Sequence, residues 1–115
     1  MREVILAAAM VGLTSCTTAA IADRSPLVSF TSQRSVAEIA TCLSTALNKR
    51  RAAVRTEQSP TGVILAISVP VAGFSSVLDT ISIDDTGNER RVVLRSKAAK
   101  APSEDRLNQL FHPCL

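Results

Sequence analysis

The feature that most restricts the fold of this chain is a short apolar run at residues 63–69, which reads Val-Ile-Leu-Ala-Ile-Ser-Val. The run is rich in β-branched side chains, and turn residues bound it, with Gly62 before it and Pro70 after it. A segment of this length and composition is typical of a strand inside a sheet. We expect a central strand that is covered on one face and partly on the other.

Weaker strand patterns surround this run, and in them apolar and polar side chains alternate as they do in half-buried strands. These patterns predict strands at residues 27–33, 52–58, 77–84 and 89–97. Ser59-Pro60-Thr61-Gly62 has the composition of a turn. Asp85-Thr86-Gly87-Asn88 joins the last two strands and is typical of a tight hairpin.

Two amphipathic helices complete the pattern. The first begins at Ser35-Val36-Ala37-Glu38, a capping-box sequence, and its buried stripe consists of Val36, Ile39, Ala40, Leu43 and Leu47. The second begins at Ser103, and its apolar side chains are Leu107, Leu110, Phe111 and Cys114. The order β-α-β-β-β-β-α indicates an α+β fold, with a single antiparallel sheet of about four or five strands and two helices packed on one face.

The composition limits what such a domain can bind. The chain has 115 residues, which suffices for one domain. Aromatic residues make up only 3% of it, with no Trp or Tyr, so the core must consist of Val, Ile, Leu and Ala. A stacking platform for single-stranded nucleic acid needs flat rings, and a net charge of +3 is too small for binding along a phosphate backbone. We expect no nucleic-acid partner.

The first residues have the pattern of an export signal. Arg2 supplies a positive charge that Glu3 partly offsets, and residues 4–13 are an unbroken run of apolar or small side chains. The run is shorter than the about twenty residues that a permanent membrane-spanning helix needs. Residues 1–15 are predicted to be a signal peptide.

This run ends in Leu13-Thr14-Ser15-Cys16, which resembles the lipobox of bacterial lipoproteins: an aliphatic residue, two small residues and a cysteine. The resemblance implies that the Cys16 thiol receives a diacylglyceryl group, that cleavage occurs before Cys16, and that the new amine carries an acyl chain such as palmitate. Thr17 follows instead of Asp, which in enterobacterial lipoproteins favours the outer membrane. The implied location is the cell envelope, lipid-anchored and facing the periplasm, with residues 16–25 as a tether and 26–115 as the domain.

Two other interpretations of the leader remain open. Ala20-Ile21-Ala22 before Asp23 matches the Ala-x-Ala site of ordinary signal peptidase. Cleavage after Ala22 would discard Cys16 and release a soluble protein. Alternatively, Cys16 is only a small hydrophobic side chain within the signal sequence.

The chain has three cysteines, and either export route accounts for the odd one. Acylation or removal of Cys16 leaves Cys42 and Cys114 as a pair in an oxidising compartment, where disulfides persist. Their bridge would close a loop of about seventy residues and contribute on the order of 4 kcal/mol in the chain-entropy model. Two unpaired buried thiols are the alternative. Two distant cysteines and one histidine match no metal-ligand spacing, so no metal or cofactor is predicted.

No catalytic residue is predicted. Asp85-Thr86-Gly87 resembles the active-site triplet of aspartic proteases, but that family also has a later glycine motif and no glycine follows Gly87. We interpret the triplet as a turn that needs glycine at positive φ. His112 is the only histidine, and the chain has no nucleophile elbow. Asp79, Asp84 and Asp85 are not a convincing carboxylate set, because the last two are neighbours on a strand and point to opposite faces.

Six basic residues could form a surface patch, and they are Arg55, Arg90, Arg91, Arg95, Lys97 and Lys100. Such a patch would attract anionic lipid headgroups or an acidic partner. The simpler interpretation, which we favour, is a solvated outer face on which Glu57, Asp84 and Glu89 alternate with the cations and pair with them across strands.

Three functions from different classes are compatible with these features. The lipobox and the paired cysteines favour a membrane-anchored, non-catalytic interaction or assembly module with a protein partner in the envelope. The second function is that of a soluble periplasmic inhibitor or ligand-binding protein released after Ala22. The third is an enzyme, for which the sequence offers no catalytic site.

Overall fold

The computed structural model describes residue 21 and residues 24–68, 77–97 and 103–115. These residues form β1 (Val28–Ser32), α3 (Val36–Lys49), β2 (Ala53–Ser59), β3 (Gly62–Ser68), β4 (Val77–Asp85), β5 (Arg90–Ser96), α4 (Glu104–Phe111) and a short 3-10 helix, η1 (His112–Cys114). The predicted α+β fold with the order β-α-β-β-β-β-α is confirmed. The predicted signal peptide, including Cys16, lies outside the described residues, and so does Lys100.

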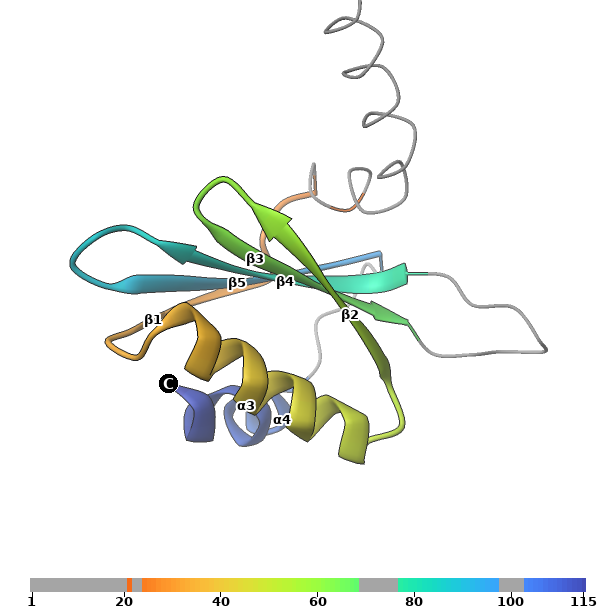
Figure 1. The fold of residues 1–115 in the computed structure, drawn as a ribbon. Helices are drawn as coiled ribbons and strands as arrows, with labels where there is room; N and C mark the ends of the chain where they lie inside the picture. Colours follow the sequence, from red (N-terminus) through yellow and green to blue (C-terminus); the bar gives the residue numbers. More distant parts are fainter. Residues whose placement is uncertain (1–20, 22–23, 69–76, 98–102) are drawn as a thin grey trace, which may run out of the picture.

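The sheet contains five strands in the order β1-β5-β4-β3-β2, and all neighbouring pairs are antiparallel (Figure 1). The apolar run forms β3, which is an interior strand as expected, although β4 is the middle one. The turns between β2 and β3 and between β4 and β5 lie at the same end of the sheet, because Gly62 pairs with Asp84. We call this the hairpin end. The opposite end, where β1, β2 and β4 begin, is the entry end.

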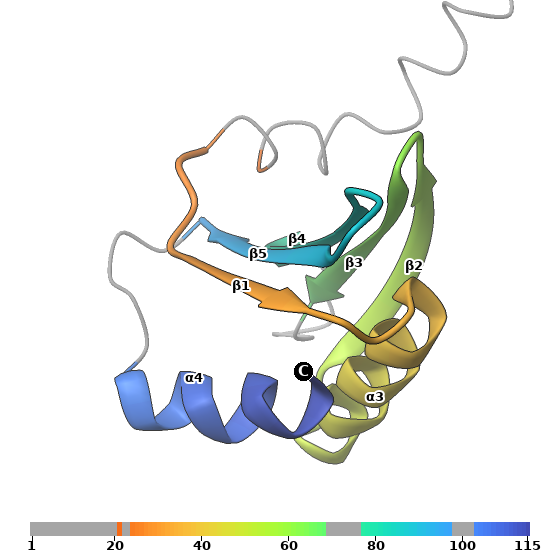
Figure 2. The ribbon, with the colours of Figure 1, turned by 90° about the vertical axis from the view of Figure 1, so that its left-hand side faces the viewer.

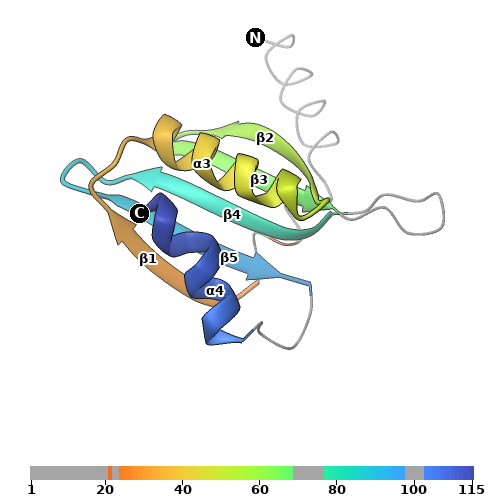
Figure 3. The ribbon, with the colours of Figure 1, turned by 90° about the horizontal axis from the view of Figure 1, so that it is seen from below.

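Both helices lie on one face of the sheet (Figure 2). Seen from below, α3 runs on the side of β2 and β3, and α4 runs on the side of β1 and β5 (Figure 3). The core between these layers is almost entirely aliphatic, as the composition requires, and consists of Ile39, Leu43, Leu47, Leu65, Ile67, Ile81, Ile83, Val92, Leu94, Phe111 and Cys114. We call the opposite face of the sheet, away from α3 and α4, the open face.

The helix boundaries follow from local hydrogen bonds. Ser35 caps α3, since its hydroxyl accepts from the Glu38 amide at 3.2 Å. At the other end, the Arg51 amide donates to Asn48 and the Ala52 amide donates to Leu47, which is the pattern of a Schellman motif. Arg51 takes the left-handed conformation there, with φ 64°, a position where glycine is usual. Among the described helices, none is long and apolar enough to cross a bilayer.

Candidate functional site

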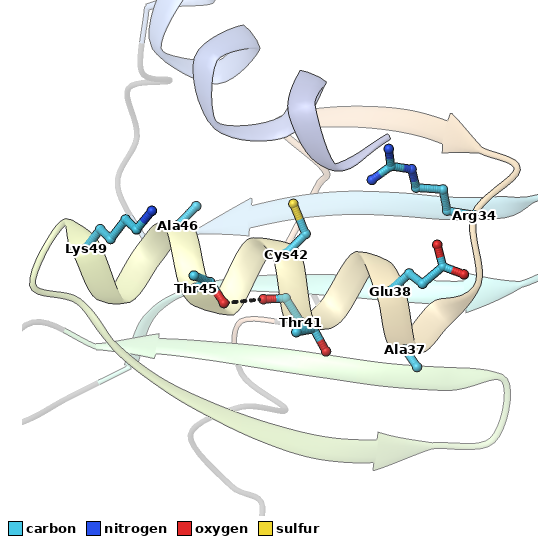
Figure 4. Close-up of a pocket in the computed structure, with 8 residues that line it drawn as sticks. All are labelled: Arg34, Ala37, Glu38, Thr41, Cys42, Thr45, Ala46 and Lys49. Carbon is cyan, nitrogen blue, oxygen red and sulfur yellow. Dashed lines mark hydrogen bonds between the residues drawn. The ribbon is translucent and has the colours of Figure 1, made fainter.

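The predicted cysteine pair connects the C-terminus to the first helix. Cys42 lies on α3 and Cys114 lies in η1, and the two are at disulfide-bonding distance with their Cα atoms 5.5 Å apart. Cys114 is almost completely buried. The pairing is possible because Cys42 stands at the edge of the buried stripe of α3, next to the C-terminal elements (Figure 4).

Further contacts hold the last residues at the hairpin end. The Ser32 hydroxyl donates to the backbone oxygen of Leu115 at 2.8 Å, and the Arg34 guanidinium donates to that of Pro113 at 3.4 Å. The rings of Phe30 and Phe111 stack with their centroids 4.9 Å apart. The end of the chain is thus fixed by covalent, polar and apolar contacts together.

A groove of roughly 740 Å³ runs along the exposed side of α3, and we call it the α3 groove (Figure 4). Its lining residues are Arg34, Ala37, Glu38, Thr41, Cys42, Thr45, Ala46 and Lys49. Small side chains form the middle of the groove, and charged side chains stand at both ends. A smaller hollow of roughly 390 Å³ lies on the side of α3 that faces β2 and β3.

Three of the side chains that line the α3 groove, those of Glu38, Cys42 and Thr45, make contacts within the domain. The sulfur of Cys42 is paired with Cys114, so it is not a free thiolate nucleophile. The Glu38 carboxylate accepts from the Ser35 hydroxyl at 3.1 Å, and the Thr45 hydroxyl donates to the backbone oxygen of Thr41 at 2.8 Å. Among the described residues there is no group of His, Cys, Asp and Glu side chains that could hold a metal ion.

The Asp85-Thr86-Gly87 triplet forms the predicted hairpin turn. Gly87 has φ 97°, and its amide donates to the Asp85 carboxylate at 2.9 Å. The same carboxylate lies 3.4 Å from the Arg90 guanidinium. The Thr86 amide and hydroxyl both donate to the backbone oxygen of Glu89. These contacts all stabilise the turn between β4 and β5.

The remaining candidate residues are not brought together. His112 is exposed in η1, and within the described part of the chain no hydrogen bond or ion pair joins it to an aspartate. Asp84 accepts from the Thr61 hydroxyl at 2.7 Å across the neighbouring turn. Asp79 belongs to the start of β4, at the other end of the sheet.

Charged side chains are sorted by the end of the sheet at which they lie. At the entry end, counting the last turn of α3 and the first turn of α4, the basic residues are Arg24, Lys49, Arg50, Arg51, Arg55, Arg95, Lys97 and Arg106, and the acidic residues are Asp79, Glu104 and Asp105. At the hairpin end, the acidic residues are Glu38, Glu57, Asp84, Asp85 and Glu89, and the basic residues are Arg34, Arg90 and Arg91. Within the described residues, the entry end is positive and the hairpin end is negative.

The expected alternation of cations with Glu57, Asp84 and Glu89 is found in part, since Asp84 lies opposite Arg91 in the register of β4 and β5. Glu57 lies 3.7 Å from Arg55 on its own strand, and the ion pair across strands is Arg90 with Asp85. The sequence analysis missed the sorting because it depends on which strand ends meet, and the strand order decides that.

Side chains at the centre of the open face are buried, so more than the strands themselves shields them from solvent. Ala66, Thr80 and Val93 are each at most 5% exposed, although none of them belongs to the core beneath the helices. Ile21 is 0% exposed and is also not part of that core. Its backbone oxygen accepts from the Arg24 amide, and the Arg24 oxygen accepts from Arg95 Nε at 3.1 Å. These contacts place Ile21 beside the open face at the entry end, whereas the sequence analysis assigned it to the tether or to the alternative cleavage site.

Within the part of the chain that the structure describes, three buried polar atoms have no hydrogen-bond partner, namely Glu57 Oε2, Ser59 Oγ and Arg90 Nε. Buried polar atoms are normally paired, but Glu57 and Arg90 each make an ion pair through another atom. We assign them no chemistry.

The fold and these surfaces define a small α+β domain whose C-terminus is fastened to its first helix and whose charges are divided between two ends. Comparisons with protein-family models, with curated proteins and with solved structures found no match.

Proposed function

We propose that this chain is a bacterial lipoprotein, anchored through Cys16, whose small domain acts as a non-catalytic interaction or assembly module of the cell envelope. The location that we propose is the periplasmic side of the outer membrane, with an envelope protein as partner. The α3 groove is the surface that we assign to that partner, because it combines small side chains with charged ends.

The observation that carries the proposal is the pairing of Cys42 with Cys114. Stable disulfides are a feature of exported proteins and are rare in the reducing cytosol. Since the chain has three cysteines, this pairing leaves Cys16 as the one available for acylation. The lipobox resemblance at Leu13-Thr14-Ser15-Cys16 supplies the chemistry by which that cysteine would be modified.

The burial of Ile21 supports cleavage before Cys16 over cleavage after Ala22. Ile21 is fully buried in the structure of the full chain, and cleavage before Cys16 keeps it in the mature protein. Cleavage after Ala22 would remove this side chain and expose apolar area beside the open face, which is unfavourable in water.

The test is metabolic labelling with palmitate of the full chain expressed in a Gram-negative bacterium, followed by separation of membrane and soluble fractions. We expect the wild-type chain to carry label and to need detergent for release, and the C16S variant to lose both properties. The matched control is C42S/C114S, which changes two other cysteines and should keep the label. Label that survives in C16S would contradict the proposal, and an unlabelled soluble protein starting at Asp23 would establish the periplasmic alternative.

A further inference from the structure

The entry end of the domain has the properties of a surface that rests on anionic lipid. Arg24, Lys49, Arg50, Arg51, Arg55 and Lys97 are all exposed there. Lys97 makes no ion pair within the described residues, and its backbone amide donates to Leu78. Leu78 is the one large hydrophobic side chain of the described part that is classed as exposed, at 36%. An apolar side chain among exposed cations suits a headgroup region, where both kinds of group find partners.

The length of chain between the lipid and the domain fixes which end can reach the bilayer. Cys16 precedes Ile21 by five residues, which span at most roughly 18 Å when fully extended. Ile21 is tied to Arg24, and Arg24 donates to the backbone oxygen of Lys97 at 3.0 Å. An acylated Cys16 would therefore hold the entry end close to the headgroups.

The hairpin end is distant from the proposed anchor and carries more acidic than basic side chains among the described residues. β4 alone has nine residues, and a strand of that length spans roughly 30 Å. This exceeds the screening length of about 8 Å at physiological ionic strength. The acidic residues of the hairpin end would also be unfavourable next to an anionic surface.

We propose that the anchored domain stands on its entry end, with Arg24, Lys97 and their basic neighbours against anionic phospholipid headgroups, and that the hairpin end points away from the membrane. This orientation rests on the proposed lipid anchor at Cys16. In this orientation the two ends of the α3 groove lie at different heights above the bilayer, with Lys49 near the lipid and Arg34 distant from it.

Tryptophan fluorescence can measure this orientation, because the chain contains no Trp or Tyr. Leu78→Trp reports from the entry end, and Asn88→Trp reports from the exposed turn at the hairpin end. Each acylated mature variant is reconstituted into vesicles of phosphatidylcholine with or without phosphatidylglycerol, with bromine on the acyl chains as quencher. Ala53→Trp, at an exposed position where β2 begins, is a second entry-end reporter should Leu78→Trp fail to fold.

We expect quenching of Trp at position 78 to exceed that at position 88 by roughly threefold or more in the anionic vesicles, and to weaken as salt is raised. K97E should lower the quenching at position 78, and the matched reversal R91E, at the hairpin end, should not. Both side chains are exposed and neither makes a hydrogen bond or ion pair within the described residues, so the fold should tolerate both changes.

Equal quenching at the two positions in acylated protein would overturn the orientation while leaving the anchor intact. Quenching that is the same in neutral and anionic vesicles, or insensitive to K97E, would overturn the role of lipid charge and leave the cations for an acidic protein. A mass without acyl chains in the same preparation would instead refute the proposed anchor, and the orientation with it.

Discussion

The two ends of the sheet differ in how their polar side chains are used. At the hairpin end, polar side chains make contacts within the domain: Ser32 with Leu115, Thr61 with Asp84, Asp85 with Arg90, and Arg90 with the backbone of Gln33. At the entry end, most cations are exposed, and the contacts that involve Arg24 and Arg95 fasten the incoming chain to β5.

Contacts that stabilise the fold therefore gather at the hairpin end, and exposed charge that could contact a partner gathers at the entry end. The hairpin end contains the tight turns and the docked C-terminus, so its side chains are partnered by the protein itself. At the entry end, Lys49, Arg50, Arg51 and Lys97 are exposed and make no ion pair within the described residues, which costs little for cations in water. These cations are therefore available to a surface of opposite charge.

The largest effect on stability that we expect comes from the bridge between Cys42 and Cys114. C42S/C114S should lower the free energy of unfolding by on the order of 4 kcal/mol, since the bridge closes a long loop. Denaturant unfolding measures this loss, and reduction of the wild-type protein should reproduce most of it. An unchanged unfolding midpoint after both treatments would show that the hairpin end does not depend on the pair.

The next effect concerns the entry end. Ile21→Ala should destabilise the mature protein by about 3 kcal/mol, because it removes buried methylene groups and leaves a cavity. Leu78→Ala, at an exposed position of the same end, is the matched control and should cost far less. If Ile21→Ala leaves the free energy of unfolding unchanged while Leu78→Ala lowers it, then Ile21 belongs to the tether and does not pack against the open face.

A smaller effect is expected in the hairpin turn of the DTG triplet. Gly87→Ala should cost about 1–2 kcal/mol, because a residue with a Cβ is disfavoured at positive φ. The added methyl group would meet no atom within 4 Å, so any loss reports the backbone conformation and not a clash. Thermal unfolding measures the change, and a stabilised variant would contradict the turn geometry.

The smallest effect belongs to the end of α3. Arg51→Gly should change stability by less than about 1 kcal/mol, because relief of the left-handed strain is offset by greater freedom of the unfolded chain. Circular dichroism melting measures it. A loss clearly larger than this would mean that the Arg51 side chain makes a contact at the entry end that its exposure does not indicate.

Much of the fold is predictable from this sequence because local signals agree with each other. Ser35 and Ser103 cap the helices that their positions predicted, and Gly87 takes the positive φ expected of the turn. The spacing of Cys42 and Cys114 on two apolar helix faces anticipated that they could meet. These features depend on residues close in sequence or on a simple periodicity.

The features that escaped prediction depend on long-range arrangement. Arg55, near the start of β2, shares an end of the sheet with Arg95 and Lys97 because β2 and β5 run in opposite directions within it, and residue spacing does not reveal that. The α3 groove arises where neighbouring elements leave small side chains uncovered. Ile21 has the sequence context of a tether, and its burial depends on contacts with Arg24 and β5.

The most direct test of the central claim is the intact mass of the mature protein purified from bacterial membranes without reduction. We predict a chain that begins at Cys16, carries the added mass of one diacylglyceryl group and one N-acyl chain, and is two hydrogen atoms lighter because of the bridge between Cys42 and Cys114. A chain that begins at Met1 or Asp23, or one in which all remaining thiols react with an alkylating reagent, would contradict it.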